Sequence, residues 1–477
     1  MPTLTLCMIV RDEEAMLGGC LQSVRGFVDE MVVVDTGSRD GTKALALEAG
    51  ARVFDFTWCD DFAAARNESL RHARGKWVLT LDADERLGPG SGARLRAALA
   101  SAKFDCGMLR LHDACRVDAR LEDIVAGRER QAEIQLVPRL LRRTDGLRYV
   151  DAIHENVAPW LRRRGMKVAG VEVDIVHLGA TKEVVDAKSK TERNIRLLRT
   201  RVERDPGDVS AYGYLVHDLM RSGRNEEAFE EAERGWQHVA RATRETLVTS
   251  IHRLATARAY LLVARGRFAE ARETAQHART LEGENPDFSF LEASASETEA
   301  LRTADPAARR ELLRAARDGY ASCMRFANRV FAQSFIFGAS TWSGSTRLGT
   351  VELALGDAAG ALRAFDIALS ARPGDRAAQL GRAEAMIELG DPTGALTRLE
   401  ALLDDQAPDA WTLAAIAVRR LGLAEDARLF TRRALSLAGK GFISAHRRER
   451  LRELGALLAG GESKGRAEPS QASRGQP

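Results

Sequence analysis

Short apolar runs that end at acidic or turn-forming residues recur along the first part of the chain. They are rich in β-branched and large apolar side chains, which is typical of strands buried on both faces of a sheet. The runs are residues 3–10, 30–35, 51–56 and 77–81. Segments with apolar residues at helical spacing lie between them, at 17–28, 42–48 and 63–72. This alternation predicts an α/β domain with a parallel sheet and right-handed crossovers.

Two of the predicted strands end in aspartates. Asp35 closes the run at 30–35, and Asp82 and Asp84 follow the run at 77–81. The carboxyl ends of parallel strands form the edge at which open α/β sheets bind ligands. Side chains at positions i and i+2 of an extended segment point the same way, so we expect Asp82 and Asp84 to converge on one object. Carboxylates suit Mg2+ or Mn2+, which also bind substrate phosphates. The alternative for a bare D-x-D is a solvated turn with a helix cap.

The chain lacks two common nucleotide-binding motifs. Neither G-x-G-x-x-G nor G-x-x-x-x-G-K-[ST] occurs at the predicted strand–helix turns. These motifs hold phosphates with backbone N–H groups at a helix N-terminus, so dinucleotide dehydrogenases and P-loop enzymes are disfavoured. If the sheet holds a nucleotide, a metal ion on Asp82 and Asp84 is the clearest alternative.

From residue 186 the strand patterns give way to helical patterns. Residues 190–204 form an amphipathic pattern that Pro206 ends. After it, a unit with a helix, a glycine turn and an alanine five residues later occurs five times. The alanines are Ala228, Ala271, Ala361, Ala395 and Ala427. The last three turn glycines, Gly356, Gly390 and Gly422, are 34 and 32 residues apart, which is the tetratricopeptide period.

The pattern sets the predicted domain organisation. Residues 1–185 form the α/β domain, 186–440 the helical repeats, and 441–477 a terminal helix with a disordered tail. Repeat regularity is lost between Gly283 and Gly344, which predicts degenerate helices or an insertion there. The polar tail after Gly460 lacks apolar periodicity, as disordered segments do. Repeats of this kind bind peptides or proteins on a concave surface, dimerise, or only support the neighbouring domain.

Composition excludes several classes of partner. The 477 residues include 45% apolar and 29% charged residues, and the net charge is +3. We therefore expect no nucleic-acid partner and no attraction to an anionic membrane. No apolar run is long enough to span a membrane, and residues 1–10 lack the basic region and cleavage site of a signal peptide. Six cysteines without a regular framework predict buried free thiols, so we expect a cytoplasmic location.

Four segments, in order and spacing, resemble the GT-A catalytic domain of family 2 glycosyltransferases. They are CMIVRDEEAMLGGCLQSV, VDEMVVVDTGSRDGT, DDFAAARNESL and WVLTLDADERL. VPRLLRR, DAIHENV and IVHLG are similar to later family segments. The resemblance is strongest to the bacterial branch with helical repeats, which includes the peptide S-glycosyltransferases of glycocin biosynthesis. It implies a GT-A (Rossmann-like) α/β domain followed by an all-α tetratricopeptide-type solenoid.

The resemblance also implies roles for individual residues. Asp82 and Asp84 would hold Mg2+ or Mn2+, with His177 as a further metal ligand or a diphosphate contact. His154 is an alternative to His177 in either role. At residues 178–180 the chain departs from many relatives, in which an aromatic residue often follows the glycine, and this departure bears on the assignment of His177. Glu155 would be the general base, and Asp151 is a second candidate. The other reading of Glu155 is an ion-pair partner of Arg139 or Arg142.

The same resemblance implies a donor site and a reaction. Asp35 and Arg66, with Arg11 and Asp82, would bind the nucleotide-sugar, and a UDP-sugar is the expected donor. The reaction would be a metal-dependent, inverting transfer of a sugar to a peptide, protein or glycan acceptor, with a homodimer through the repeats as a further expectation. Two alternatives stay open at this point. One is a repeat scaffold with an inactive glycosyltransferase domain, and the other is a nucleotidyltransferase.

Overall fold

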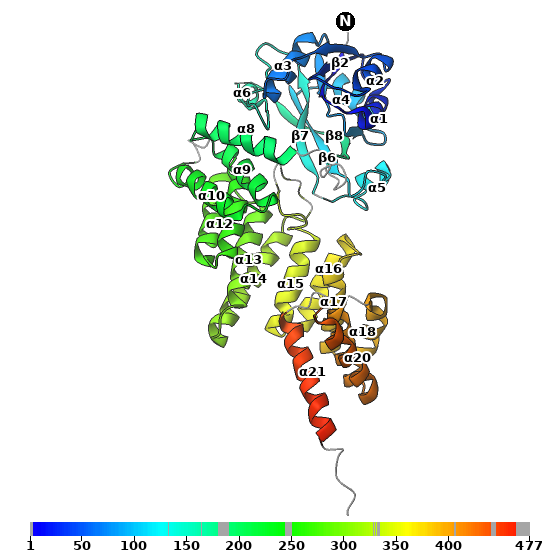
Figure 1. Ribbon diagram of the computed structural model, residues 1–477, viewed down its shortest axis with the longest axis vertical. Coiled ribbons are helices and arrows are strands. Elements are labelled where there is room, and N and C mark those ends of the chain that lie inside the picture. Colours follow the sequence, from blue (N-terminus) through cyan, green and yellow to red (C-terminus); the bar gives the residue numbers. More distant parts are fainter. Residues whose placement is uncertain are drawn as a thin grey trace, which may run out of the picture. The chain divides into compact units, whose positions relative to one another are not determined.

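The protein is described by a computed structural model (Figure 1). The structure describes residues 3–131, 133–163, 165–179, 190–243, 250–327, 329, 331, 334–404, 407–439 and 445–463. Two compact units divide the chain. The first comprises Met1–Leu291 with Asn328–Gly338, and the second comprises Glu292–Ala327 with Ala339–Pro477. The predicted boundaries after residues 185 and 440, and most of the predicted tail, lie outside the described residues and stay predictions.

The first unit begins with an eight-stranded mixed sheet. Its order is β3-β2-β1-β4-β7-β6-β8-β5. The strands are β1 (Leu4–Val10), β2 (Glu30–Asp35), β3 (Arg52–Asp55), β4 (Trp77–Thr80), β5 (Glu85–Leu87), β6 (Cys106–Asp113), β7 (Gln135–Arg142) and β8 (Val168–His177). The first four strands pair in parallel, as predicted from the alternation of strands and helices. β7 is antiparallel to both β4 and β6, so the sheet is mixed beyond its four parallel strands.

Helices cover both faces of the parallel part of the sheet. The helices of this part of the chain are α1 (Glu14–Val24), α2 (Thr42–Glu48), α3 (Phe62–His72), α4 (Ser91–Ala100), α5 (Leu121–Val125) and α6 (Ala158–Leu161), of which α5 packs against β6 and β8. Alternate β1 residues such as Leu6 and Met8 pack with Leu17 of α1 and Leu95 of α4 on one face. Cys7 packs with Leu70 of α3 on the other face. Successive residues of β1 face opposite sides of the sheet, so an apolar helix face is needed on each side to bury them.

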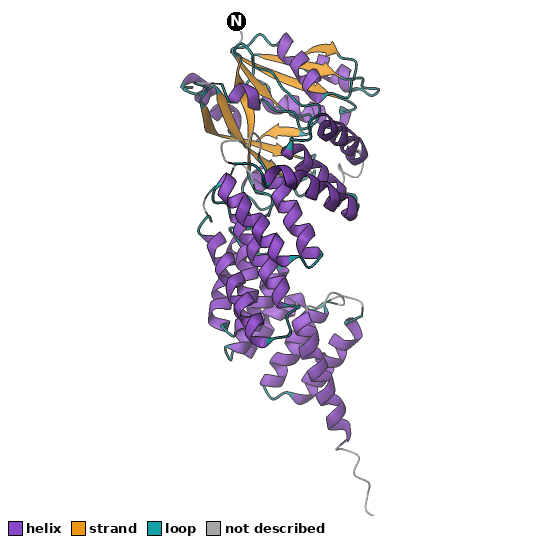
Figure 2. Ribbon diagram, turned by 90° about the vertical axis from the view of Figure 1, so that its left-hand side faces the viewer, coloured by secondary structure: helices purple, strands orange, loops and turns teal. Residues whose placement is uncertain are grey.

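The remaining described helices belong to the repeat region, and the orange strands in Figure 2 all lie in the N-terminal part of the chain. In the first unit they are α8 (Lys190–Arg204), α9 (Val209–Arg221), α10 (Asn225–Val239), α11 (His252–Ala264) and α12 (Phe268–Glu282). α13 (Pro286–Ala300) contains the division between the units. α8 has the bounds predicted from its amphipathic pattern.

The second unit continues with helix pairs. Its helices are α14 (Pro306–Met324), α15 (Trp342–Leu355), α16 (Ala358–Ala371), α17 (Arg376–Glu388), α18 (Pro392–Leu399) with the short η1 (Glu400–Leu402), α19 (Pro408–Arg420), α20 (Ala424–Leu437) and α21 (Ala445–Ser463). The five alanines predicted to lie at helix crossings are all buried. Gly356, Gly390 and Gly422 have positive φ, the conformation in which glycine commonly ends a helix. The irregular stretch after Gly283 is helical in α13 and α14.

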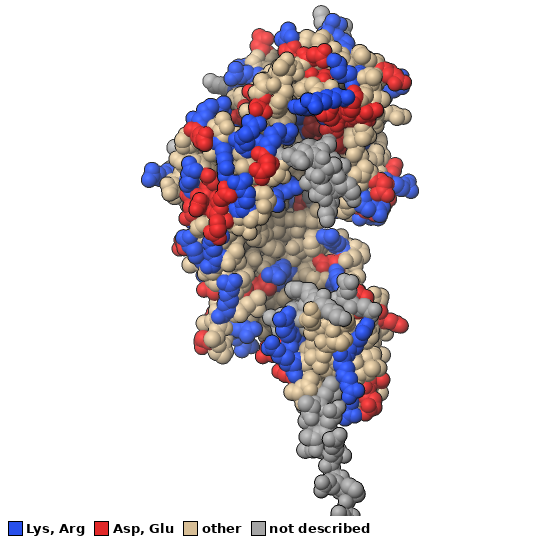
Figure 3. All heavy atoms as spheres, in the orientation of Figure 1, with Lys and Arg blue, Asp and Glu red and all other residues tan. Residues whose placement is uncertain are grey.

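Surface charge and cysteine exposure can be compared with the expectations from composition. Lys and Arg alternate with Asp and Glu over the face shown in Figure 3, as a near-balanced net charge predicts. All six cysteines are free, but Cys59 and Cys115 are exposed. The expectation that every thiol is buried was wrong at these two positions, which lie in connections between elements. Within the described residues, no helix combines the length and apolarity that a membrane crossing requires.

Candidate functional site

A pocket of about 720 Å³ lies at the carboxyl edge of the parallel strands. The register pairs Val10 of β1 with Asp35 of β2, so Arg11 and Asp35 reach the same edge. The turn after β4 brings Asp82 and Asp84 to this pocket, and Arg11, Arg66 and Glu155 also line it. The predicted convergence of strand ends and acidic residues at one edge is therefore present.

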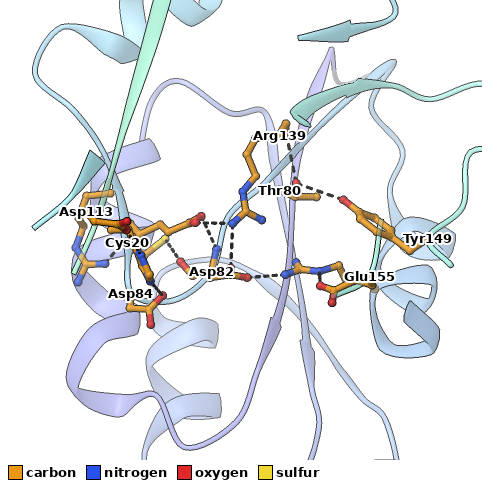
Figure 4. Close-up of polar contacts among 12 residues, drawn as sticks. Cys20, Thr80, Asp82, Asp84, Asp113, Arg139, Tyr149 and Glu155 are labelled. Carbon is orange, nitrogen blue, oxygen red and sulfur yellow. Dashed lines mark hydrogen bonds and ion pairs between the residues drawn. The ribbon is translucent and has the colours of Figure 1, made fainter. Parts of the chain in front are cut away.

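Asp82 and Asp84 do not converge on one object. Residues 83–84 form a turn, and the N–H of Glu85 donates to the carbonyl of Asp82 over 3.0 Å. The i, i+2 rule holds only for extended backbone. The turn therefore directs the two side chains to different partners, and Figure 4 shows Asp82 beside Arg139 with Asp84 apart from it. The expectation that the two carboxylates act together on a metal is corrected by this local geometry.

Both oxygens of Asp82 are held by arginines. Arg66 Nη2 donates to Oδ1 over 2.7 Å, and Arg139 Nη2 donates to Oδ2 over 3.0 Å. Arg139 also pairs with the buried Glu85, whose Oε2 accepts the N–H of Asp82 over 2.9 Å. Burial by itself raises the pKa of Asp82, but the charges of Arg66 and Arg139 outweigh burial and hold this pKa well below its usual range. Asp82 is thus a fixed anion whose two oxygens have cationic partners.

Arg66 connects Asp82 to the candidate base. Its Nε donates to Glu155 Oε1 over 2.5 Å, and the guanidinium lies 5.7 Å from the ring of Tyr149. Arg66 is only 7% exposed, so its charge requires these two carboxylates. The ion pair expected for Glu155 exists, but its partner is Arg66. Arg139 and Arg142 pair with other carboxylates.

Asp84 faces His177 at the other side of the pocket. His177 Nε2 lies 3.8 Å from Asp84 Oδ1, and its Nδ1 contacts Asp113 Oδ1 at 2.7 Å. Burial by itself lowers the pKa of His177, but the bond to Asp113 and the charges of Asp84 and Glu85 raise it to about 9. A carboxylate on Nδ1 orients the ring and directs Nε2 outward, which is the arrangement found behind metal-ligating histidines.

Gly179 leaves the space that Asp84 and His177 occupy. A Cβ atom at this position would lie 2.0 Å from Asp84 Oδ2 and 2.9 Å from His177 Nε2. Any other residue would therefore displace one of the two side chains. The N–H of Leu178 donates to the carbonyl of Asp84 over 2.9 Å and fixes the backbone of this segment. The glycine at this position is a steric requirement of the Asp84–His177 pair.

Asp35 presents one unpaired carboxylate oxygen. Its Oδ1 accepts the N–H groups of Gly37 and Ser38, each over 2.9 Å. Its Oδ2 is buried and meets no donor within the described part of the chain. A buried oxygen without a partner carries a desolvation cost that a ligand donor would remove. An N–H or O–H group of a bound nucleoside would supply such a donor.

Two other predicted residues lie in different surroundings. Asp151 does not line this pocket. Its carboxylate pairs with Arg201 of α8 over 3.0 Å and accepts the side-chain N–H of Asn156 over 2.7 Å, so we correct its predicted catalytic role to a structural one. His154 lines the pocket but stacks on Tyr214 of α9, and burial lowers its pKa to about 3. A neutral His154 lacks the charge that a diphosphate contact would use.

The residues that could hold a metal are Asp84 and His177. Within the described residues, no group of three or more His, Cys, Asp or Glu side chains is arranged to bind a metal ion. Both carboxylate oxygens of Asp82 accept hydrogen bonds from arginines, so they do not point freely at a metal ion, and the predicted metal role of Asp82 has no support here. Two protein ligands suit a cation that shares its remaining positions with water and substrate phosphate.

Several residues of the site were missed by the sequence reasoning. Arg139 was considered only as a partner of Glu155, and Asp113 and Glu85 were not considered. Asp113 and Glu85 lie at the ends of β6 and β5, and Arg139 lies within β7. The residue pattern does not specify the register or the neighbours of these strands. One signal was available. The spacing of Gly179 two residues after His177 marks a close approach, since glycine is often retained where a Cβ would collide.

The fold and the pocket together define an α/β domain of the nucleotide-binding type, joined to helical repeats. Comparison with known families agrees. Residues 5–136 match the model of glycosyl transferase family 2, and residues 352–428 match a tetratricopeptide repeat model. The N-terminal part of the chain is therefore a family 2 glycosyltransferase domain of the GT-A-like fold, and tetratricopeptide repeats follow it.

Individual relatives match about half of this chain. A TPR repeat-containing protein of Synechococcus elongatus is 33% identical over 229 residues, which cover 47% of this chain and 54% of that protein. The SPbeta prophage-derived glycosyltransferase SunS of Bacillus subtilis is 23% identical over 234 residues, covering 48% of this chain and 52% of that protein. The chain thus spans about half the length of these curated relatives.

Solved structures give weaker likenesses. Glucosyl-3-phosphoglycerate synthase of Mycobacterium tuberculosis, solved with Mn2+, UDP and glucosyl-3-phosphoglycerate, is 19% identical with a TM-score of 0.31, covering 43% of this chain and 80% of that chain. A tetratricopeptide repeat protein of Parabacteroides merdae is 14% identical with a TM-score of 0.38, covering 57% of this chain and 94% of that chain.

Proposed function

We propose that this protein is a metal-dependent, inverting glycosyltransferase that moves a sugar from a nucleotide-sugar, with a UDP-sugar as the expected donor. The observation that carries the proposal is the pair Asp84 and His177 at the carboxyl edge of the sheet, with Gly179 leaving room for both. The family 2 match of the N-terminal domain supports it. The peptide, protein or glycan acceptor and a homodimer through the repeats remain predictions.

The proposed donor site consists of one unpaired carboxylate oxygen, on Asp35, and of three side chains that line the pocket. Asp35 Oδ2 would accept a hydrogen bond from the base or ribose of the nucleotide. Arg11 lines the pocket and would approach the phosphates. Asp84 and His177 Nε2 would hold Mg2+ or Mn2+, which neutralises the departing diphosphate when bound. Since the pKa of His177 is about 9 in the structure, its proton must leave before Nε2 can act as a ligand.

Glu155 is the proposed general base. Its carboxylate lines the pocket and would take the proton of the acceptor hydroxyl or thiol. The freed oxygen or sulfur then forms the bond to the anomeric carbon, and the bond from that carbon to the diphosphate breaks on the opposite face. Arg66 holds Glu155 and Asp82 in place through its two ion pairs, so we assign Arg66 and Asp82 mainly to positioning.

A binding experiment tests the proposal. Purified protein is titrated with UDP- and GDP-sugars with and without Mn2+, beside Asp84→Ala and a control variant, Asp55→Ala. Asp55 lies at the end of β3 on the same sheet edge, but it pairs with Lys43 and its side chain is 75% exposed. We expect Mn2+-dependent binding and slow donor hydrolysis that Asp84→Ala loses and Asp55→Ala keeps.

The same experiment decides between the proposal and its alternatives. An inactive domain on a repeat scaffold would bind no nucleotide-sugar with or without Mn2+ while remaining folded. A nucleotidyltransferase would instead consume a nucleoside triphosphate and release pyrophosphate. Either result would overturn the proposed glycosyl transfer.

A further inference from the structure

The pocket has a wall that comes from the repeat region. Arg193 and Asn194, both on α8, line it together with Arg11 and Phe62 of the α/β domain. Within the described residues, α8 is the first helix after the sheet, and it belongs to the same compact unit as the sheet. A residue of the helical region therefore faces the same cavity as Asp84 and His177.

Two contacts C-terminal to Arg193 fasten α8 to the α/β domain. Arg196 Nη1 pairs with Asp60 over 3.0 Å. Arg201 Nη1 donates to the carbonyl of Ile153 over 2.8 Å, and this side chain is buried. These two attachments lie one and two turns along the helix from Arg193. They hold the wall in place independently of any ligand.

Arg193 differs from three other arginines on this helix. Arg196, Arg199 and Arg201 each pair with a carboxylate. Within the described part of the chain, the one acceptor of Arg193 is the amide oxygen of Asn194, over 3.1 Å, and its guanidinium lies 5.2 Å from the ring of Phe62. Among the described residues it has no ion pair, and its Nε is buried without an acceptor.

Arg11 adds a second positive charge to this wall. Its ion pair with Asp12 spans 3.9 Å, and both side chains are 49% exposed, so this contact is weak. Burial, and then the charge of Arg11, lower the pKa of Arg193. Two guanidinium groups that face one cavity without a close carboxylate repel each other. An anion bound between them would relieve the repulsion and satisfy Nε.

We propose that Arg193, with Arg11, binds the phosphate groups of the donor nucleotide, so that a helix of the repeat region completes the donor site. The inference rests on the proposed glycosyltransferase function, which supplies the anion. Guanidinium groups suit phosphates because they offer several N–H donors in one plane. The ring of Phe62, 5.2 Å from the guanidinium, adds a cation–π contact that helps to hold Arg193 at the pocket.

The test compares two arginines on one helix in the full-length protein. Arg193→Ala and Arg193→Lys are measured beside Arg199→Ala, because Arg199 pairs with Glu227 and does not line the pocket. Binding of UDP and of UMP is measured by calorimetry with Mn2+ at low and high salt, with thermal unfolding as the folding control. We expect Arg193→Ala to weaken UDP binding about tenfold or more, as removal of a charge-assisted hydrogen bond does.

The other variant, the second ligand and the salt concentration test whether the contact is to phosphate. Arg193→Lys should recover part of the affinity, and the loss in Arg193→Ala should be smaller for UMP and at high salt, because fewer phosphate charges and screening both weaken the contact. Equal UDP affinity in wild type and Arg193→Ala would overturn the inference but leave the proposed function standing. If the folded wild-type protein binds no nucleotide, the proposed function fails and the inference falls with it.

Discussion

His177 Nε2 faces Asp84 across 3.8 Å, and the absence of a side chain at residue 179 makes this approach possible. The two residues lie almost a hundred positions apart in sequence, and the antiparallel pairing of β5 with β8 brings them together. The approach of His177 to Asp84 therefore depends on the glycine at residue 179.

Gly179→Ala should abolish metal-dependent nucleotide binding. The added Cβ would lie 2.0 Å from Asp84 Oδ2, so the carboxylate or the imidazole must turn away. The control is Gly170→Ala in β8, the strand that ends two residues before Gly179, because a Cβ at residue 170 meets nothing within 4 Å. Calorimetric titration with UDP and Mn2+ checks this. Normal binding by Gly179→Ala would show that the Asp84–His177 approach is not needed.

Glu155→Gln should slow catalysis and leave nucleotide binding nearly intact. The amide keeps an oxygen for the N–H of Arg66, but it cannot take a proton from the acceptor. Loss of a general base costs about 10²–10⁴-fold in rate. Asp151→Asn is the control, because Asp151 lies outside this pocket and pairs with Arg201. Donor hydrolysis, with water as acceptor, gives the rate. A rate equal to wild type would remove Glu155 from the mechanism.

Much of the fold followed from residue patterns. The strand 30–35 and the helices 42–48 and 190–204 have the predicted bounds, because each is delimited by a change between apolar and polar residues. The edge shared by Asp35 and Asp84 also followed, since parallel strands align their carboxyl ends.

The contacts within the site did not follow from the sequence. Asp82 and Asp84 were expected to point the same way, but the turn between them separates their directions. Arg139 reaches Asp82 only because β7 pairs with β4, and no local pattern specifies that neighbour. Arg193 belongs to a helix that sequence periodicity assigned to the repeats. Its place at the pocket depends on long-range packing, which periodicity does not report.

The neutral state of His154 should make stability fall at acidic pH. Burial lowers its folded-state pKa from 6.5 to about 3, and the charge of Arg253 contributes. Below about pH 6.5 the unfolded chain takes up a proton that the folded state refuses, so stability is full above 6.5 and falls as pH decreases toward 3. At about pH 5 the loss is roughly 2 kcal/mol.

His154→Phe provides the comparison. Phenylalanine keeps a ring to stack on Tyr214 but cannot be protonated, so the drop in Tm between about pH 7.5 and about pH 5 should shrink. Scanning calorimetry of both proteins at the two pH values measures the difference. Equal drops in the two proteins would show that His154 does not resist protonation in the folded state.

Removal of the Arg201 side chain should destabilise the first unit. Arg201 is 5% exposed and pairs with Asp151 and Asp208 at 3.0 and 2.7 Å. Arg201→Ala leaves two carboxylates without their cation, which costs about 3–5 kcal/mol when the pair is buried. Arg204→Ala, at an exposed position of the same helix, should cost less than about 0.5 kcal/mol. Denaturant unfolding followed by fluorescence distinguishes the two variants.

Gly381→Ala should destabilise the second unit through a single steric contact. The buried ring of Phe365 on α16 packs against Gly349 of α15 and Gly381 of α17, and a Cβ at 381 would lie 2.2 Å from the ring. Phe365 is 1% exposed and cannot move aside, so the cost should be about 1–3 kcal/mol. Gly374→Ala, where a Cβ meets nothing within 4 Å, is the control.

The same two variants should leave nucleotide binding unchanged. The helices α15, α16 and α17 lie in the second unit and the nucleotide pocket lies in the first, so UDP affinity at low temperature should stay unchanged in both variants. Thermal unfolding and UDP titration of each variant test these two expectations, and a weaker UDP affinity in Gly381→Ala would show that the two units are energetically coupled.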